Sequence, residues 1–288
     1  MPISPGAFRQ KYFNISFDGV LGQQRISLGN YRSSFSGSAF RKNAYRDLRD
    51  FIKQRGRYEG GANGASHVWT ETGHMYSDLL APMPYVHVDT SILKRMFQGV
   101  GRPQDFNNLL RAIDVYLTRV EMTDKHMTKL DWSYVPWSVQ EYANAFFGTD
   151  CQGFVGAYLR ENYPRVRDTA KDMAFYIDGY NKSPANFHIR DKGGSFTRID
   201  DPRDVRPHDV LVKCDNGDGK RHVAMIDTVG NATEMGVIVK TAESRGSKGL
   251  CELHGELRRT KKKHQSGKND RNWKHSGAEY NFVLRPKL

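Results

Sequence analysis

Apolar residues recur at helical spacing through the first half of the chain. In the segment 43–54, for example, Leu48, Phe51 and Ile52 fall on one face, and a Gly-rich stretch follows. On this basis helices are predicted over residues 43–54, 91–98, 104–119 and 138–147, and another is predicted to begin at Cys151. The front of the chain is therefore expected to be mainly helical.

The pattern changes near residue 205, where short runs rich in β-branched residues begin. Strands are predicted over residues 209–213, 222–227, 236–243 and 280–284, and a solvated basic loop over residues 258–274. Residues 1–40 indicate irregular structure with a short strand or two. Helices followed by antiparallel strands predict the α+β class, with an N-terminal extension over residues 1–125 and a second domain over residues 126–288.

The segment that begins at Asp150 carries the first sign of chemistry. Counted from Cys151, apolar residues lie at offsets of three, four, seven and eight, so the thiol is expected on the buried stripe of its helix. Asp150 is expected to cap the first turn, where the positive end of the helix dipole favours a thiolate. The alternative is a structural cysteine, since most lone cysteines pack as small apolar residues.

A histidine at the start of a predicted strand supplies a partner for this thiol. His222 begins the run 222–227 and shares a face with Ala224 and Ile226. From that position its imidazole can reach a helix that lies across the sheet, which is the arrangement that a Cys-His pair requires. Taken alone, a histidine at a strand edge is more often an ordinary surface residue. The combination with Cys151 is what favours chemistry.

Three short segments resemble signatures of the NlpC/P60 superfamily of papain-like cysteine hydrolases. The sequence Asp-Cys-Gln-Gly-Phe-Val at 150–155 is similar to the Asp-Cys-Ser-Gly-Leu/Phe-Val motif of that family's nucleophile helix. The sequence Arg-Pro-His-Asp-Val-Leu at 206–211 resembles its Pro-Gly-Asp-Leu strand, and His-Val-Ala-Met-Ile at 222–226 resembles its His-Val-Gly-Ile-Tyr strand. The resemblance covers roughly residues 129–287, and the order and spacing of the segments also fit.

The resemblance implies a papain-like fold in which the nucleophile helix packs on an antiparallel sheet, with residues 126–288 as the catalytic domain. It implies a cysteine amidase or endopeptidase that cleaves amide bonds in peptidoglycan stem peptides. Cys151 would be the nucleophile and His222 the base, and no cofactor would be needed. Gln152 stands where the family has Ser, and His208 where it has Gly. Gln152 is therefore expected to contact the substrate and to change which substrate the protein accepts.

The third catalytic residue is expected on the strand after His222, where the family most often has His, Asn or Gln. Glu243 and Ser244 are both candidates, and strand alternation allows only one of them to point inward. Glu243 is preferred because a carboxylate can orient an imidazole and stabilise its protonated form. Tyr134 matches the family's upstream tyrosine that touches substrate, with aromatic packing as the alternative.

Composition narrows the choice of partner. The 288 residues carry a net charge of +12, which favours a polyanion such as nucleic acid, an anionic membrane or a cell-wall polymer. The resemblance selects peptidoglycan and argues against nucleic acid. Three cysteines are too few for a disulfide framework. A set of Cys and His residues late in the chain matches no compact zinc spacing, so no metal site is expected; its members are Cys251, His254, His264 and His275.

The sequence also bears on location. No run of about 18 apolar residues predicts a membrane span, and residues 1–10 lack the apolar core of a secretory signal. With the cell-wall signature, this predicts a protein made in the cytoplasm and exported by a dedicated secretion system, as an antibacterial effector with an immunity protein would be. Two alternatives stay open: a thioester-forming acyltransferase or deamidase of the same fold, and a non-catalytic module that binds a polyanion.

Overall fold

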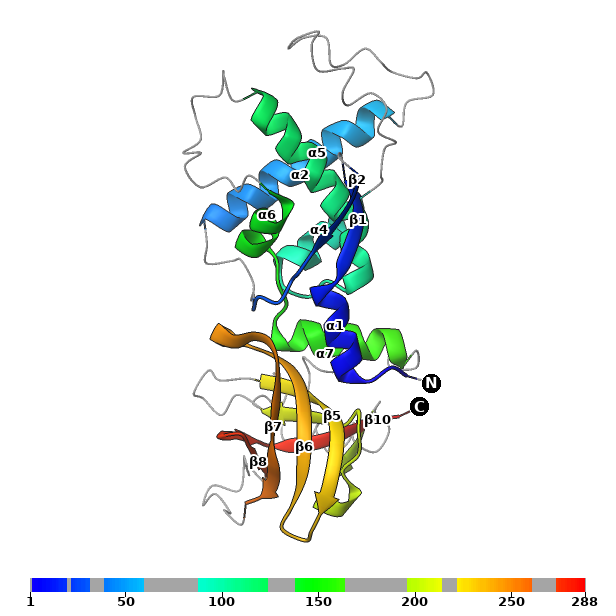
Figure 1. Ribbon diagram of the computed structural model, residues 1–288, viewed down its shortest axis with the longest axis vertical. Helices are drawn as coiled ribbons and strands as arrows, with labels where there is room; N and C mark the ends of the chain where they lie inside the picture. Colours follow the sequence, from blue (N-terminus) through cyan, green and yellow to red (C-terminus); the bar gives the residue numbers. More distant parts are fainter. Residues whose placement is uncertain are drawn as a thin grey trace, which may run out of the picture. The chain divides into compact units, whose positions relative to one another are not determined.

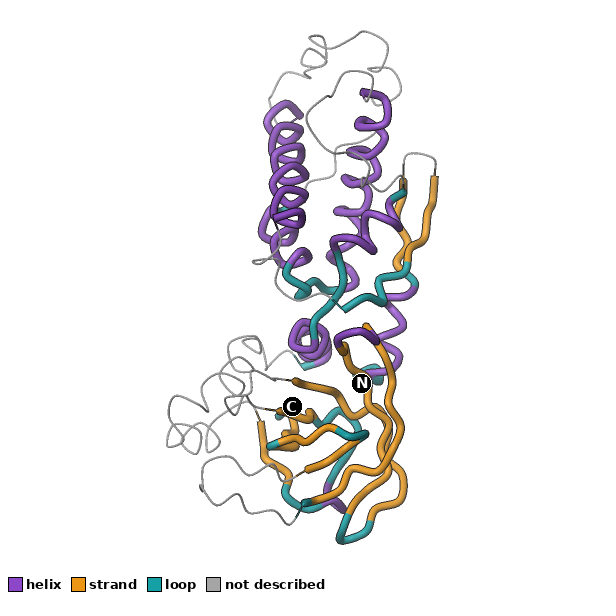
Figure 2. Tube along the Cα trace, turned by 90° about the vertical axis from the view of Figure 1, so that its left-hand side faces the viewer, coloured by secondary structure: helices purple, strands orange, loops and turns teal. Residues whose placement is uncertain are grey.

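The computed structural model describes most of the chain as two units, each with its own packing. The described residues are 2–19, 22–31, 39–59, 88–123, 138–163, 196–213, 222–260 and 273–287. One unit runs from Tyr12 to Gly148, and the other combines Met1–Lys11 with Thr149–Leu288. The expected division at 125/126 lies among residues 124–137, which are outside the described part. Figure 2 shows that the first unit is mainly helical and that the second contains most of the strands.

The helical unit pairs a small hairpin with a group of helices. Strands β1 (Ile15–Gly19) and β2 (Gly22–Ile26) are antiparallel. The helical segments are α2 (Ala39–Glu59), α4 (Thr90–Phe97), η2 (Pro103–Asp105), α5 (Phe106–Thr123) and α6 (Val139–Phe146). Apolar residues on these helices, such as Leu48 of α2 and Ile113 of α5, are fully buried. The helices therefore form where the 3.6-residue periodicity predicted them, within a few residues at each end.

The second unit is built around an eight-stranded antiparallel sheet with the order β3-β10-β4-β5-β6-β7-β8-β9. Its helices are α1 (Pro5–Phe13, of which residues up to Lys11 belong here) and α7 (Cys151–Asn162). Its remaining segments are β3 (Phe196–Ile199), η5 (Pro202–Asp204), β4 (Val210–Lys213), β5 (His222–Ala232), β6 (Gly236–Arg245), η6 (Gly246–Lys248), β7 (Gly249–Arg259), β8 (Trp273–His275), β9 (Ala278–Tyr280) and β10 (Phe282–Pro286). The mixture of helix with antiparallel sheet confirms the α+β class.

The sheet closes on itself through its last strands. β9 pairs with β8, β10 pairs with β4, and only Asn281 separates β9 from β10. Asn281 donates its backbone N–H to the carbonyl of Val212 at 2.8 Å, so the chain passes directly from one end of the sheet to its middle. The enclosed face carries an apolar core made of Ile199, Val205, Leu211, Ala224, Ile226, Val237, Val239, Leu257, Trp273, Tyr280 and Val283.

Helix α7 packs against strands β5 and β6 (Figure 1). Phe154, Val155, Tyr158 and Leu159 are fully buried, as the offsets from Cys151 predicted. The ring of Phe8 in α1 packs on Phe154 and Tyr158, with centroids 5.9 and 5.4 Å apart. The expected irregular start of the chain is therefore wrong for residues 5–13. That segment is helical because Asp227 accepts a hydrogen bond from the N–H of Gly6 at 2.7 Å and because α7 covers Phe8.

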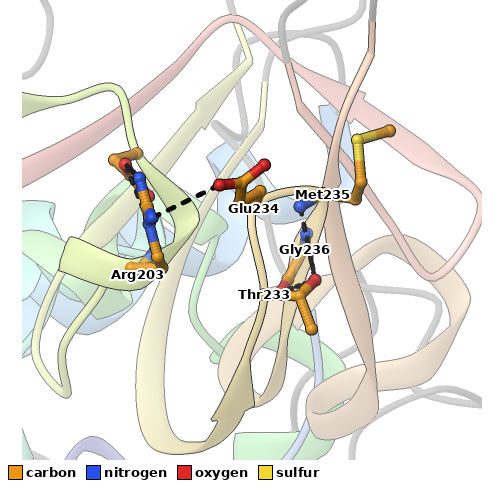
Figure 3. Close-up of polar contacts among 6 residues, drawn as sticks. Arg203, Thr233, Glu234, Met235 and Gly236 are labelled. Carbon is orange, nitrogen blue, oxygen red and sulfur yellow. Dashed lines mark hydrogen bonds and ion pairs between the residues drawn. The ribbon is translucent and has the colours of Figure 1, made fainter.

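A hydrogen-bonded turn joins β5 to β6. Thr233 accepts hydrogen bonds from the N–H groups of Met235 and Gly236 at its hydroxyl, each at 3.3 Å, and Arg203 lies 3.7 Å from Glu234 (Figure 3). Two irregularities then shift the register, between Ile226 and Thr228 and between Val229 and Ala232. The face that each residue of β6 presents therefore depends on bulges that the turn alone does not set.

Strands also occur where a solvated loop was expected. Residues 258–259 belong to β7 and residues 273–274 to β8, while residues 261–272 lie outside the described part. β7 pairs with β6 along its whole length, from Arg245↔Gly249 to Gly236↔Arg258. None of the helices in the described part of the chain combines the length and the hydropathy that a bilayer-spanning helix needs.

Candidate active site

Cys151 is the first residue of α7 and is held there by a capped and anchored helix start. The Asp150 carboxylate accepts a hydrogen bond from the N–H of Gly153, which satisfies one of the unpaired amides of the first turn. Burial raises the pKa of Asp150 to about 6, against the lowering effect of its bonds from the Gly153 and Gln152 amides. The Cys151 side chain is half-buried, so it borders both the core and the solvent.

His222 brings together the thiol and a carboxylate. Its Nε2 contacts Oε2 of Glu243, and its ring also makes a hydrogen bond with Cys151. The carboxylate engages Nε2, which leaves Nδ1 as the ring nitrogen available to the thiol. His222 is the first residue of β5, which lies between β4 and β6 and also contacts α7. From this position its ring reaches both Glu243 of β6 and Cys151 at the start of α7. The structure thus brings Cys151, His222 and Glu243 into one chain of contacts.

The charges in this chain of contacts support one another. Burial by itself would lower the pKa of His222, but the hydrogen bonds to Cys151 and Glu243 outweigh it and raise that pKa to about 9. Burial works to raise the pKa of Glu243, and the histidine overcomes it, so the carboxyl pKa is lowered. The arrangement therefore favours an imidazolium beside an ionised carboxylate. The imidazole also lies within hydrogen-bond reach of the Cys151 thiol, which is the contact that a nucleophile and its base require.

Two neighbours of Glu243 on the same strand were not anticipated from the sequence. The hydroxyl of Thr241 donates to Oε1 of Glu243 at 3.1 Å, and Nε of Arg245 lies 3.5 Å from Oε2. Both follow from the period of two along β6, because residues two before and two after Glu243 share its face. Once Glu243 is chosen as the inward residue, the sequence itself points to these two positions.

An aromatic ring covers the imidazole from the enclosed face. Tyr280 of β9 is fully buried, and its ring centroid lies 6.2 Å from that of His222, at an interplanar angle of 46°. Burial raises the pKa of its phenol well above the ordinary value, and the negative charge of Glu243 adds to the effect. Because Tyr280 and Glu243 are both fully buried, the contact between His222 and Glu243 lies in surroundings of low polarity, where it is electrostatically stronger than in water. Tyr280 was expected only as the start of a strand.

The alternative third residue faces the other way. The buried Ser244 donates its hydroxyl to the backbone carbonyl of Thr149 at 2.5 Å, one residue before the cap of α7. Asp227 likewise points away from the imidazole, since it bonds to Gly6 and lies 2.9 Å from the ammonium of Lys240. Ser244 therefore anchors the helix start, and Glu243 is the residue that meets the histidine.

The structure describes one of the two residues that were expected to contact substrate. Gln152 is the second residue of α7 and is half-buried, and its backbone N–H bonds to the Asp150 carboxylate. Tyr134 lies outside the described residues. Within the described ranges, no group of three His, Cys, Asp or Glu side chains has the geometry of a metal site.

The turn before β4 holds a second histidine in an unusual backbone conformation. His208 has φ of 76°, in the left-handed region that favours glycine. Its N–H donates to the carbonyl of Ile226 at 2.7 Å, which ties this turn to β5. Asp209 is buried and accepts two hydrogen bonds from Arg285, each at 2.9 Å, which fix the turn against β10. The turn thus supports the strand that carries His222.

Comparison of the chain with protein-family models, with curated proteins and with solved structures gives no match. The interpretation of the site therefore depends on its own geometry and on the three short segments described above.

Proposed function

We propose that this protein is a cysteine hydrolase of amide bonds, with Cys151 as nucleophile, His222 as acid and base, and Glu243 as the residue that orients the imidazole. The observation that supports this most is the continuous contact from Cys151 through His222 to Glu243, with the pKa of His222 raised to about 9. Burial opposes protonation of an imidazole, and here the Glu243 carboxylate offsets that cost. Strongly shifted pKa values of this kind are typical of functional sites.

The proposed mechanism uses groups that the site already contains. The Cys151 thiolate attacks the amide carbonyl, and the backbone N–H at the start of α7 is in the right part of the helix to donate to the developing oxyanion. The His222 imidazolium then gives its proton to the leaving amine, and the C–N bond breaks to leave a thioester on Cys151. The neutral His222 then deprotonates a water molecule, which hydrolyses the thioester. This step releases the carboxylic acid product and restores the Cys151 thiolate and the His222 imidazolium.

Peptidoglycan stem peptides are the substrate class that we propose. The support is the local likeness to the NlpC/P60 signatures, together with a helix that begins at Cys151 and packs on an antiparallel sheet. The positive φ at His208 adds to it, because that residue stands where the family has Gly and adopts a conformation that Gly adopts readily. The net charge of +12 also suits an anionic wall polymer. Export as an antibacterial effector belongs to the same proposal.

Incubation of the purified full chain with soluble peptidoglycan fragments tests this function, with the products identified by mass. We expect fragments whose masses sum to that of the substrate plus one water. Cys151→Ala should abolish them, whereas Cys251→Ala, which removes the half-buried free thiol of β7, should leave them unchanged. Products that carry an added amine in place of water would indicate acyl transfer. Equal product formation by Cys151→Ala would exclude this cysteine as the nucleophile.

A further inference from the structure

The carboxylate that meets His222 is held from its other side by a second set of polar groups. Oε2 of Glu243 contacts His222, and Oε1 accepts a hydrogen bond from Thr241 at 3.1 Å. Glu243 and Thr241 are both fully buried. A carboxylate inside a protein can rotate about its last torsion, which is broad, unless hydrogen bonds fix it. The bond from Thr241 therefore bears on how Glu243 presents Oε2 to the imidazole.

The direction of the Thr241 proton follows from its neighbours. The hydroxyl oxygen lies 3.1 Å from the Glu243 carboxylate, 3.4 Å from the carbonyl of Leu253 and 3.5 Å from Nε2 of His275. A hydroxyl has one proton, and the shortest contact is also the charge-assisted one, so the proton goes to Glu243. We assign the ring proton of His275 to Nε2, which then donates to the Thr241 oxygen at 3.5 Å.

His275 is buried in β8 with a second hydroxyl beside it. Its side chain has no exposed surface, and the hydroxyl of Ser276 lies 3.3 Å from the same Nε2. Burial lowers the pKa of His275, so the neutral ring is favoured. Gly255 of β7 lies against this ring, since a Cβ there would be 3.7 Å from Cε1 of His275. The neutral imidazole is thus packed with Nε2 toward Thr241.

We propose that Thr241 and His275 are positioning residues of the catalytic site, because they form a hydrogen-bonded chain from β8 to Glu243 that holds this carboxylate in line with His222. The chain runs from His275 through Thr241 and Glu243 to His222 and ends at Cys151. The inference rests on the proposed function, in that a fixed carboxylate matters only if His222 serves Cys151.

The charged and titratable groups around Glu243 come from every strand packed against it. They are His222 of β5, Arg245 of β6, Cys251 of β7, His275 of β8 and Tyr280 of β9. Of these, His222 and Arg245 act on Oε2, and Thr241 alone among the described residues donates to Oε1. Loss of the Thr241 hydroxyl should therefore loosen the carboxylate without removing its charge.

The reactivity of Cys151 toward iodoacetamide tests the chain of contacts without knowledge of the substrate. The rate is followed by the mass of the Cys151 peptide from pH 5 to pH 9, in the full protein and in two pairs of variants. Thr241→Val removes the hydroxyl and keeps the shape, whereas Thr241→Ser keeps the hydroxyl. His275→Asn places its amide near the position of Nδ1, whereas His275→Gln places it near that of Nε2. Thr228→Val, at an exposed position of β5, is the control for the substitution itself.

We expect Thr241→Val to slow alkylation of Cys151 at neutral pH by roughly three- to tenfold, the size expected from one hydrogen bond, and His275→Asn to slow it by a smaller factor. Thr241→Ser and His275→Gln should restore most of the rate, and Thr228→Val should match the wild type. On a cleavable substrate the loss should fall on kcat and leave KM within about twofold. Thermal melting of each variant identifies any that fails to fold. If Thr241→Val is such a variant, the comparison of His275→Asn with His275→Gln tests the positioning role.

Two outcomes distinguish a failure of this proposal from a failure of the proposed function. If Cys151 in the wild type reacts faster than Cys251 but Thr241→Val and His275→Asn match the wild type, the positioning role is wrong and the proposed function stands. If Cys151 reacts no faster than Cys251 at any pH in this range, there is no activated thiol, and both proposals are wrong.

Discussion

Two histidines of the sheet unit differ in the groups that contact the imidazole. His222 contacts the Glu243 carboxylate and the Cys151 thiol, and its pKa is raised to about 9. His208 contacts two phenols at one ring nitrogen, Tyr163 at 2.6 Å and Tyr158 at 3.1 Å, and burial lowers its pKa. Burial opposes the charged form of both rings. The charge of Asp227 acts to raise the pKa of His208 but does not outweigh burial, whereas the hydrogen bonds of His222 to Glu243 and Cys151 do outweigh it.

The comparison teaches which histidine is suited to chemistry. Neutral hydroxyls can satisfy an imidazole but do not favour its protonated form as a carboxylate does. His208 therefore serves the turn that supports β5, and its aromatic neighbours lie perpendicular to its ring, at interplanar angles of 89° and 90°. His222 is instead poised to hold and release a proton beside a thiol.

The largest expected effect is on catalysis and separates the two histidines. His222→Ala should lower kcat/KM on peptidoglycan fragments by about a thousandfold or more, because nucleophile and base act as one unit. His208→Asn should change it by less than about fivefold, since Asn tolerates the left-handed backbone at this position. Initial rates for both variants decide the matter. Comparable losses would mean that His208 is as important to the reaction as His222, and the distinction drawn between the two histidines would be wrong.

The next effect concerns the charge that distinguishes the two sites. Glu243→Gln should keep the shape of the contact and lower the rate by ten- to a thousandfold, the scale expected when an orienting group loses its charge. In the wild type the rate should fall as pH rises through about 9, where His222 loses its proton. The variant should show this alkaline limb at lower pH, because the carboxylate no longer favours the imidazolium. If the alkaline limb does not move, the raised pKa of His222 must come from its contact with Cys151 alone.

The pH dependence of stability should have opposite signs at the two histidines. The pKa of His222 is raised from 6.5 to about 9, so the folded state binds more protons in that window. Its stabilising effect is full below pH 6.5 and is lost as pH rises to about 9. The pKa of His208 is lowered from 6.5, so its contribution is present above pH 6.5 and is lost as pH falls below it.

Urea unfolding from pH 5 to pH 10 measures this difference. Relative to wild type, His222→Gln should lose of the order of 2 kcal/mol at pH 6 and much less at pH 10. His208→Asn should instead differ more from wild type in its pH slope below pH 6.5 than above it. Parallel curves for both variants and the wild type would show that neither ring is linked to folding in the manner described.

The smallest effect concerns the neighbour of Glu243 on the opposite face of β6. Ser244→Ala should lower the free energy of unfolding by about 1 kcal/mol, because the buried carbonyl of Thr149 loses its hydrogen bond. The rate should change by less than about threefold, since the hydroxyl touches neither His222 nor Cys151. Urea titration and initial rates measure the two quantities. A loss of rate as large as that of Glu243→Gln would contradict the division of roles between these residues.

The sequence by itself determined the parts of the site that depend on local rules. The buried stripe of α7, its Asp150 cap and the position of Cys151 follow from periodicity and capping, which involve residues a few positions apart. The strands that begin near Val210, His222 and Gly236 follow from alternation and turn residues. The preference for Glu243 over Ser244 followed from chemistry, because a carboxylate suits an imidazole better than a hydroxyl does.

Only the tertiary structure decided how these parts meet. The face of β6 that carries Glu243 depends on two shifts of register in β5, and a shift of one residue would exchange Glu243 with Ser244. The helix α1 forms because Asp227, more than two hundred residues away, bonds to Gly6. His275 and Tyr280 reach the site because the last strands close the sheet. Contacts between distant segments leave no periodic trace in the sequence, since their cause is the packing of the whole unit.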